Sequence, residues 1–410
     1  MSEKIYAGMD LGQRFHQVAV VGADRKELVA PFRVGRGCQG IQEFFDGLHF
    51  LTRDPEQMVV TVEATGNYWN ELIWDLSARG CEVYLAHPKK AHDLRRFFAL
   101  HTKTDITDAE ALARMPLVDE QLSPVWVPQR VQQVLLRMCR LRWKYRCRIA
   151  DIKKRISRFA DTVMPGIGEV MPIRYSKSAR LFLRRYLASG KAKRVGRKRL
   201  SQIMSKAAWG KFSEERQRKL WECIQNAPDL GLLPDDILLE AGVQLDELDM
   251  LEHQVERLDS RIAELYAEVD PQHILLQIPG AGEFLAAALT AAIGDVRRFP
   301  SGKHLISYAG LAPRVKSSAG TTRAGQGITK HGSPFLRAWA YLAANTARRY
   351  DPDLKAYYTR LRKRRKHHNV ALCATAARLL ERCHELLGEG VAIVRESPGQ
   401  IPCTGSDPKV

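Results

Sequence analysis

The alternation of strand-like and helix-like segments in the first 116 residues constrains the fold of this chain more than any other feature. Short apolar runs at 5–11, 16–21 and 28–34 predict three successive strands, with turns around 12 and 22–24. A helix over 40–48 should follow, and then strands at 59–64 and 81–86 alternate with helices at 67–78, 89–99 and 105–115. The N-terminal part is therefore predicted to be an α/β domain.

This element order is that of an RNase H-like domain, which we place at residues 1–128, and four acidic residues occupy matching positions in it. Asp10 lies near the end of the first strand, Glu63 at the end of the fourth, and Asp105 and Asp108 near the start of a helix. Strands one and four are neighbours in such a sheet, and residues at i and i+3 share one helix face, so the four carboxylates should converge. Taken singly, each residue is more often a cap or a surface residue, and Asp105 alone is compatible with a helix N-cap.

Four converging carboxylates repel one another unless a cation lies among them. Oxygen ligands favour Mg²⁺ or Mn²⁺. Two such ions can hold the attacking and leaving oxygens of a phosphodiester. The sequence therefore predicts a metal-dependent site that acts on phosphodiesters, with all four residues as metal ligands.

Two long helices are predicted in the middle of the chain, residues 129–270. Apolar residues recur at three-to-four spacing from Val131 to Val163, and more regularly from Leu248 to Val269. Such stripes with charged flanks favour coiled-coil helices. One helix is basic and the other acidic, so they can pair antiparallel within one chain or between chains.

The positive charge of the chain is concentrated in this middle part. The whole chain has a formal charge of +18, whereas residues 137–220 alone contain 26 basic and 5 acidic residues, a net charge of +21. Residues 1–136 are net negative, at −3. A segment of this charge is typical of proteins that bind nucleic acid, because neutralised phosphates release counterions. The alternative is a solvated surface that keeps the chain soluble.

A basic insertion, at about 166–235, separates the two long helices. Aromatic residues such as Tyr175 and Trp209 are interleaved with its basic residues, which favours contact with a nucleic-acid backbone and stacking on unpaired bases. A poorly ordered charged loop is the alternative. The residues of the insertion that we assign to nucleic-acid binding are Arg184, Arg185, Lys193, Arg194, Arg197, Lys198 and Arg199.

Residues 271–390 are predicted to form a mainly α-helical C-terminal domain. The Pro279-Gly-Ala-Gly282 motif precedes an apolar helix, and it fits either a phosphate site at the helix N-terminus or a tight connection between helices. A stretch rich in Gly, Ser and Thr follows at 310–332, and Ser333-Pro334 has the pattern of a helix start. Residues 391–410, rich in Pro and Gly, are expected to be a disordered tail.

Several classes of protein are disfavoured by composition. The eight cysteines are scattered, without a Cys-x-x-Cys pair, which is typical of reduced thiols in a cytosolic protein and not of a disulfide framework or a zinc site. The apolar runs are too short to span a membrane, and the N-terminus does not have the pattern of a secretion signal. We expect a cytoplasmic protein that associates with the nucleoid.

These motifs together resemble the DEDD transposases of insertion sequence family 110, including its 1111 subgroup. Asp10, the Glu63-Ala-Thr-Gly66 segment and Lys103-Thr-Asp-Ile-Thr-Asp108 match the acidic tetrad of that family in order and context. The C-terminal match lies in Ile278-Pro-Gly-Ala-Gly282, Phe299, Tyr308-Ala-Gly-Leu-Ala-Pro-Arg314 and Ile328-Thr-Lys-His-Gly332. The resemblance covers about 1–165 and 245–385, and it implies an N-terminal domain similar to the Holliday-junction resolvase RuvC.

The resemblance implies a DNA transposase or recombinase in which the metal-bound tetrad works with a serine of the C-terminal domain. That serine forms a covalent phosphoserine link to DNA and conserves the bond energy for rejoining. Counting from Pro313 places it at Ser318, although Ser317 stands beside it and the family usually has Gly directly after the serine. Four basic residues around this segment are candidates for holding the phosphate backbone: Arg314, Lys316, Arg323 and Lys330.

The resemblance also implies partners: DNA at the element ends and target, and a structured guide RNA, encoded by the element, that pairs with the DNA. Strand exchange at two duplexes implies a homodimer or tetramer. Two other functions stay open at this point. One is a metal-dependent junction resolvase or nuclease that uses water as nucleophile, and the other is a catalytically inactive nucleic-acid-binding protein.

Overall fold

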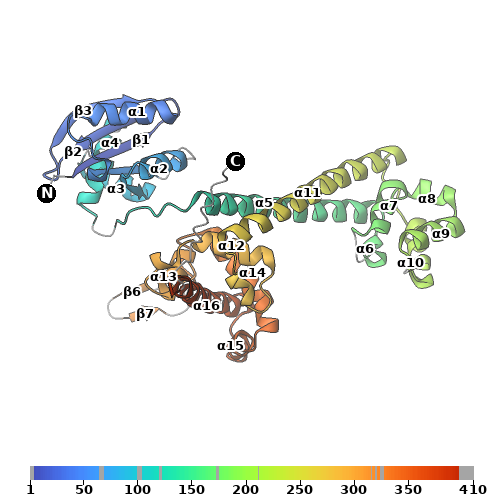
Figure 1. Cartoon of the computed structure of the whole chain (residues 1–410). Helices are drawn as coiled ribbons and strands as arrows, with labels where there is room; N and C mark the ends of the chain where they lie inside the picture. Colours follow the sequence, from blue (N-terminus) through green and yellow to red (C-terminus); the bar gives the residue numbers. More distant parts are fainter. Residues whose placement is uncertain are drawn as a thin grey trace, which may run out of the picture. The chain divides into compact units, whose positions relative to one another are not determined.

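In a computed structural model, the chain forms two compact units, Met1–Pro128 and Gln129–Val410 (Figure 1). The structure describes residues 4–63, 69–98, 104–119, 122–171, 175–210, 212–314, 316–318, 321–323 and 327–396. Each unit is treated by itself below.

The first unit is built on a five-stranded mixed sheet with strand order β3-β2-β1-β4-β5. The three N-terminal strands pair antiparallel, and the last two add in parallel on the other side of β1. The predicted α/β character of the N-terminal part and the adjacency of its first and fourth strands are confirmed. The strands are β1 (Ile5–Leu11), β2 (His16–Val21), β3 (Glu27–Val34), β4 (Met58–Glu63) and β5 (Glu82–Ala86).

Helices cover both faces of this sheet. Phe44 of α1 (Gly37–Leu48) and Leu76 of α2 (Trp69–Ala78) are fully buried and pack in one cluster with Met9 of β1. Helix α4 (Asp105–Arg114) lies against β1 and β2, and α3 (Pro88–Phe98) packs against α4. The described residues of this unit also include two short 3-10 helices, η1 (Pro55–Gln57) and η2 (Met115–Leu117).

Two long helices, α5 (Arg130–Val163) and α11 (Pro234–Val269), lie side by side in the second unit. Ion pairs connect Arg142 with Asp259 and Arg155 with Glu247, so positions that rise along α5 meet positions that fall along α11. The basic and acidic helices therefore pair antiparallel within the chain, which is one of the two arrangements that the sequence left open.

The insertion between these helices is itself helical and has a core. Phe182, Met204 and Ile224 are buried in one cluster with Ile156 of α5 and Leu248 of α11. In its described residues the insertion is therefore packed structure and not an extended charged loop. Its helices are α6 (Ile167–Val170), α7 (Lys177–Arg185), α8 (Ser189–Val195), α9 (Arg197–Ala207) and α10 (Glu214–Gln225).

The C-terminal part packs around an alanine-rich core that also takes in Leu135 of α5 and Ile262 of α11. Gly280 has a φ of +84°, and a Cβ there would meet the Cα of Ala347 at 3.2 Å, so the 278–282 segment is a tightly packed connection. The elements are η3 (Ile274–Gln277), α12 (Glu283–Ile293), η4 (Val296–Arg298), α13 (Gly302–Ala309), β6 (Lys316–Ser318), β7 (Thr321–Arg323), α14 (Pro334–Tyr350), α15 (Pro352–Lys363) and α16 (His368–Glu396).

One expectation about the C-terminal end differs from the structure. Helix α16 continues to Glu396, six residues into the segment expected to be a tail, because the apolar run 391–394 continues the helix and Pro398 comes later. The rest of that segment, 397–410, lies outside the described residues. Within the part of the chain that the structure describes, no helix is both long and apolar enough to cross a membrane.

Candidate carboxylate site

The site begins with a glycine that lets a helix approach the sheet. Alternate residues of β1, among them Met9, face the α1–α2 side and are buried there, so Gly8 and Asp10 belong to the opposite face. A Cβ on Gly8 would lie 2.0 Å from the backbone oxygen of Ala109 in α4 and 2.3 Å from the nitrogen of Ala113. The absence of a side chain at Gly8 therefore allows α4 to pack directly on β1. The point of contact lies about one helical turn from Asp105 and Asp108 of α4.

The start of α4 is fixed by a capping box. The Thr104 side chain accepts a hydrogen bond from the Thr107 amide at 3.2 Å, and the Thr107 hydroxyl accepts one from the Thr104 amide at 3.0 Å. Thr104 is thus the N-cap, and the interpretation of Asp105 as the cap is wrong. Asp105 and Asp108 stand in the first helical turn, where the positive helix end favours carboxylates.

The four predicted carboxylates act on one another electrostatically. Burial, and then the charges of Asp108, Asp105 and Glu63 in that order, raise the pKa of Asp10 to about 6. Glu63 follows Val62, whose Cα partner on β1 is Met9, so Asp10 and Glu63 are the next residues along two paired parallel strands. The structure thus places the four acidic residues in one neighbourhood.

One of the four already has a cationic partner. The Nη1 of Arg95 on α3 donates to Oδ1 of Asp108 at 2.8 Å, and its Nη2 lies 2.7 Å from Nδ1 of His92. Arg95 cannot be identified from the sequence, because nothing in the spacing of a basic surface helix indicates which acid it meets.

The donor set fits a hard divalent cation, although the side chains are not arranged as a finished metal site. Among the residues that the structure describes, no three His, Cys, Asp or Glu side chains are grouped closely enough to hold an ion. The mutual repulsion that raises the Asp10 pKa is nevertheless what a divalent cation would relieve, and carboxylates are the ligands that Mg²⁺ and Mn²⁺ prefer.

The candidate serines lie in the second unit, on a small hairpin. Strands β6 and β7 pair antiparallel, with Ser317 opposite Thr322 and Ser318 opposite Thr321. The side chains of Lys316, Ser317, Ser318 and Arg323 lie outside what the structure describes. At the base of the hairpin, the Arg314 amide donates to the Gly327 oxygen at 2.9 Å, and both Arg314 and Lys330 are exposed.

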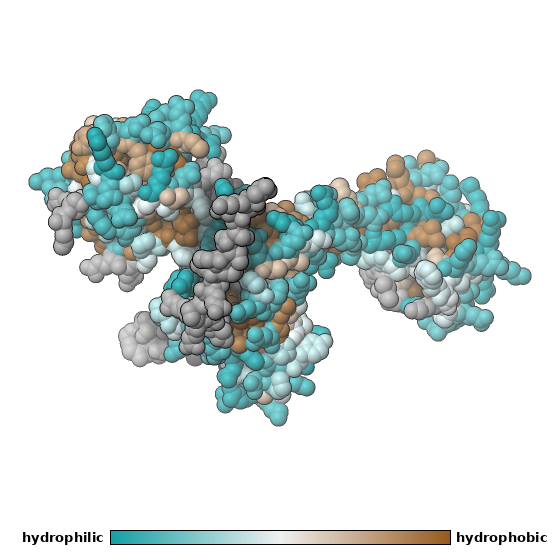
Figure 2. Space-filling view, in the orientation of Figure 1, coloured by the Kyte–Doolittle hydropathy of each residue, from teal (hydrophilic) through white to brown (hydrophobic). Residues whose placement is uncertain are grey.

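The basic residues of the insertion fall into two groups. Arg184 forms ion pairs with Asp246 and Asp249 of α11, each at 2.6 Å, so its charge is used within the unit. Figure 2 shows hydrophilic surface interrupted by hydrophobic patches over helices α7 to α10. The remaining predicted residues are exposed there: Arg185, Lys193, Arg194, Arg197, Lys198 and Arg199.

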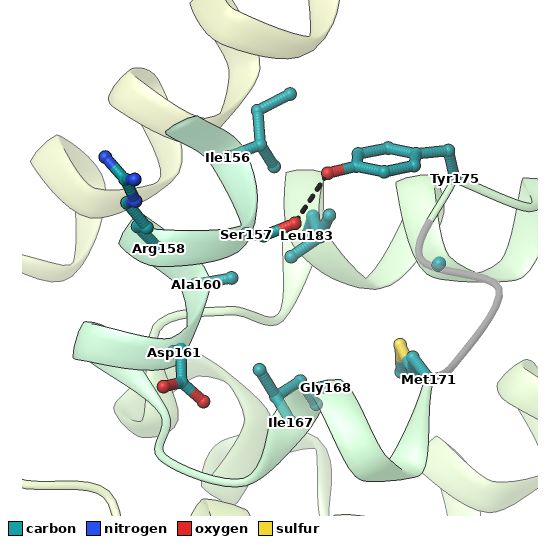
Figure 3. Close-up of a pocket in the computed structure, with 11 residues that line it drawn as sticks. Ile156, Ser157, Arg158, Ala160, Asp161, Ile167, Gly168, Met171, Tyr175 and Leu183 are labelled. Atoms are coloured by element: carbon teal, nitrogen blue, oxygen red, sulfur yellow. Dashed lines mark hydrogen bonds between the residues drawn. The ribbon is translucent and has the colours of Figure 1, made fainter. Parts of the chain in front are cut away.

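The insertion also contains a cavity of about 210 Å³ between α5, α6 and α7 (Figure 3). Ser157 and Tyr175 meet at one side of it, with their oxygens 2.7 Å apart, and Ile156, Ile167 and Leu183 supply apolar walls. The lining includes the carboxylate of Asp161 and no residue of the predicted catalytic set.

Comparisons with known proteins agree with the motif positions. Residues 7–165 match the family model for the DEDD transposase of IS110, and residues 272–359 match the transposase family IS116/IS110/IS902. The IS116 uncharacterized 44.8 kDa protein of Streptomyces clavuligerus is 24% identical over 388 residues, covering 92% of this chain and 93% of that protein. The pilin gene-inverting protein of Moraxella bovis is 23% identical over 380 residues, covering 92% and 94%.

Two further matches cover less of the chain. The IS110 uncharacterized 43.6 kDa protein of Streptomyces coelicolor is 28% identical over 223 residues, 53% of this chain and 54% of that protein. Among solved structures, T. thermophilus RuvC in complex with a Holliday junction substrate is 17% identical and covers 30% of this chain and 99% of that one, with a TM-score of 0.22. From the two family models and the full-length relatives, the chain belongs to the IS116/IS110/IS902 transposase family and is a DNA transposase.

Proposed function

We propose that this transposase excises and inserts an insertion sequence, with Asp10, Glu63, Asp105 and Asp108 as metal ligands and Ser318 as nucleophile. The observation that supports this most is the raised pKa of Asp10, to which burial contributes most and the charges of the other three carboxylates add. Mg²⁺ or Mn²⁺ held by them would supply positive charge to a reacting phosphodiester.

The serine step balances without a further reactant. Oγ of Ser318 bonds to phosphorus as it loses its proton, and the bridging P–O bond breaks so that the leaving strand ends in a hydroxyl. The phosphoserine remains a diester, and a DNA hydroxyl can later reverse the step. Ser317, in the adjacent position of β6, is the alternative nucleophile.

The partners of this reaction are proposals of the same kind. DNA at the element ends and at the target is the substrate, and an element-encoded guide RNA supplies sequence choice by base pairing. The exposed basic residues of the insertion, and Arg314 and Lys330 beside the hairpin, are suited to nucleic-acid backbones. We further propose coiled-coil pairing of α5 and α11, a dimer or tetramer, and a cytoplasmic, nucleoid-associated location.

A trapped covalent adduct tests the nucleophile. The purified chain is incubated with Mg²⁺ and a nicked suicide substrate that carries the element end, and protein–DNA adducts are separated on a denaturing gel. Ser318→Ala should abolish the adduct, whereas Ser317→Ala and the matched control Ser307→Ala, on the exposed face of α13, should retain it.

The reverse pattern at the two hairpin serines would transfer the role to Ser317. Cleavage that persists without any adduct in the unmodified chain would favour the nuclease alternative, in which water is the nucleophile. DNA inversion is a second recombination outcome worth scoring, since the Moraxella bovis relative is named as a pilin gene-inverting protein.

A further inference from the structure

A row of side chains crosses the sheet beside the carboxylates. The Cα partner of Asp10 on β2 is Gln17, and the Cα partner of Gln17 on β3 is Arg33. Cross-strand partners project from the same face of a sheet, so Arg33 belongs to the face that carries Asp10. Two strand spacings of about 4.8 Å separate the backbones of Arg33 and Asp10 by roughly 10 Å.

The guanidinium of Arg33 is held in one orientation by its neighbours. Its Nε donates to Oε1 of Gln17 at 3.3 Å, and its Cζ lies 4.1 Å from the centre of the Phe15 ring. Gln17 is itself buried, at 3% exposed, and its amide nitrogen donates to the Phe32 oxygen at 3.0 Å. The buried side-chain amide of Gln17 is thus held by the backbone of β3, and its oxygen orients the Arg33 side chain.

Arg33 is nevertheless exposed, and its charge is not neutralised by an acid. Among the residues that the structure describes, no carboxylate forms an ion pair with Arg33. With Nε committed to Gln17 and one face on Phe15, the two terminal nitrogens remain on the exposed side. A preorganised fork of this kind is the geometry that binds phosphate oxygens.

A second arginine lies by the same turn. Nη1 of Arg36 donates to the backbone oxygen of Gln13, in the turn between β1 and β2, at 3.1 Å. Arg36 also acts electrostatically on His16, the first residue of β2, whose pKa burial and then the Arg36 charge lower. The exposed Arg14 stands in that turn as well. Three arginines therefore surround the end of β1, in a unit whose sequence is net negative overall.

We propose that Arg33 and Arg36 bind the phosphate backbone of the DNA strand on which the carboxylates act. At a rise of 3.4 Å per nucleotide, the roughly 10 Å from Arg33 to Asp10 corresponds to about three steps along a strand. The arginines then hold the backbone two or three nucleotides from the reacting phosphodiester. This inference rests on the proposed function for the identity of the strand, and it adds a contact outside the predicted site residues.

The test measures the salt dependence of DNA binding by the full chain. The probe is a fluorescein-labelled 30-bp duplex of mixed sequence, in Ca²⁺ so that cutting does not intervene, and affinity is followed by anisotropy as salt is raised. Each lost phosphate contact lowers the log–log slope by about 0.9. Arg33→Gln with Arg36→Gln should therefore reduce the slope by about 2.

Matched variants separate charge from structure. Arg53→Gln removes an exposed arginine before the start of β4, away from Glu63 at its end, and should leave the slope unchanged. Arg33→Lys keeps the positive charge and should retain most of the slope. A slope that is unchanged in the double variant overturns the proposal, provided that its circular dichroism and melting temperature match those of the unmodified chain.

The result of this DNA-binding test is independent of the result of the serine-adduct test. If the chain forms the serine adduct but the slope does not change, this inference fails and the proposed function stands. If the slope changes but no adduct or cleavage is found, the phosphate contact stands and the proposed catalytic role fails.

Discussion

Nη1 of Arg95 donates to Oδ1 of Asp108 at 2.8 Å, and the two side chains are only 14% and 19% exposed. The pair connects α3 to the start of α4 and neutralises one of four neighbouring carboxylates. A divalent cation that takes Asp108 as a ligand has to displace this guanidinium or share the carboxylate with it. Metal binding and the ion pair therefore compete for the same oxygen atoms.

Removing the guanidinium should strengthen metal binding. A partly buried ion pair is worth about 1 kcal/mol, so Arg95→Ala is expected to lower the Kd for Mn²⁺ roughly 3- to 10-fold. Electron paramagnetic resonance of free Mn²⁺ during a titration of the full chain measures this. Arg96→Ala removes the exposed neighbouring arginine and should not change the Kd. Weaker Mn²⁺ binding in Arg95→Ala would mean that Arg95 positions Asp108 for the metal instead of competing with it.

The raised pKa of Asp10 predicts a pH-dependent stability of the metal-free chain. An acid whose folded pKa is raised stabilises the fold fully below its unfolded pKa, near 3.8, and this stabilisation is lost as pH rises through about 6. Asp10→Asn should remove this loss and raise the free energy of unfolding at pH 8 by about 1–2 kcal/mol, less than the full pKa shift implies because solvent screens a partly exposed group. Urea unfolding of Asp10→Asn and of the unmodified chain, in EDTA at pH 5 and at pH 8, measures this difference in the free energy of unfolding. The transition of the first unit is followed. Equal stability of both proteins at pH 8 would contradict the expectation.

The close approach at Gly8 predicts a severe effect of a single methyl group. The Cβ of Gly8→Ala would meet the Ala109 oxygen at 2.0 Å, so α4 must move away from β1. We expect a loss of about 2–3 kcal/mol of stability, together with weaker Mn²⁺ binding because Asp105 and Asp108 move with the helix. Gly242→Ala in α11, where nothing lies within 4 Å of the added Cβ, is the control and should be neutral or stabilising. Unimpaired Mn²⁺ binding in Gly8→Ala would show that α4 does not need to contact β1 at this point.

The sequence was sufficient for the sheet and for the strand and helix positions of the four acidic residues, because both follow from local pattern and chain order. Short apolar runs bounded by turn residues mark the strands, and the position of an acid at a strand end follows from them, as for Asp10 and Glu63. The same reasoning could not find Arg95 or the row from Asp10 to Arg33. Those contacts depend on which helix covers which face and on cross-strand register, which a single sequence with no partner information leaves open.

The net charge of a segment does not show which of its basic residues are available to bind nucleic acid. The net charge of +21 over 137–220 indicated nucleic acid, but it could not distinguish residues that face solvent from those that neutralise α11. The basic character of Arg184 predicts a contact with nucleic acid, whereas the structure pairs it with Asp246 and Asp249. The acids are 62 and 65 residues away in sequence, which is why spacing within the insertion gave no sign of them.

The two groups of basic residues in the insertion should therefore respond differently to substitution. Arg184→Ala leaves Asp246 without its ion-pair partner and leaves Asp249 with Arg180 alone, so it should lower the stability of the second unit, by less than about 1 kcal/mol because the two acids are exposed. It should leave the salt slope of duplex binding unchanged. Arg199→Ala, in the first turn of α9, removes an exposed positive charge from a positive helix end, so stability should not fall. Its salt slope should fall by about 0.9 if the residue contacts a phosphate. Urea denaturation and anisotropy titrations of both variants at several salt concentrations give the two quantities. A fall of the slope in Arg184→Ala with none in Arg199→Ala would reverse the assignment, and nucleic acid would then have to compete with α11 for Arg184.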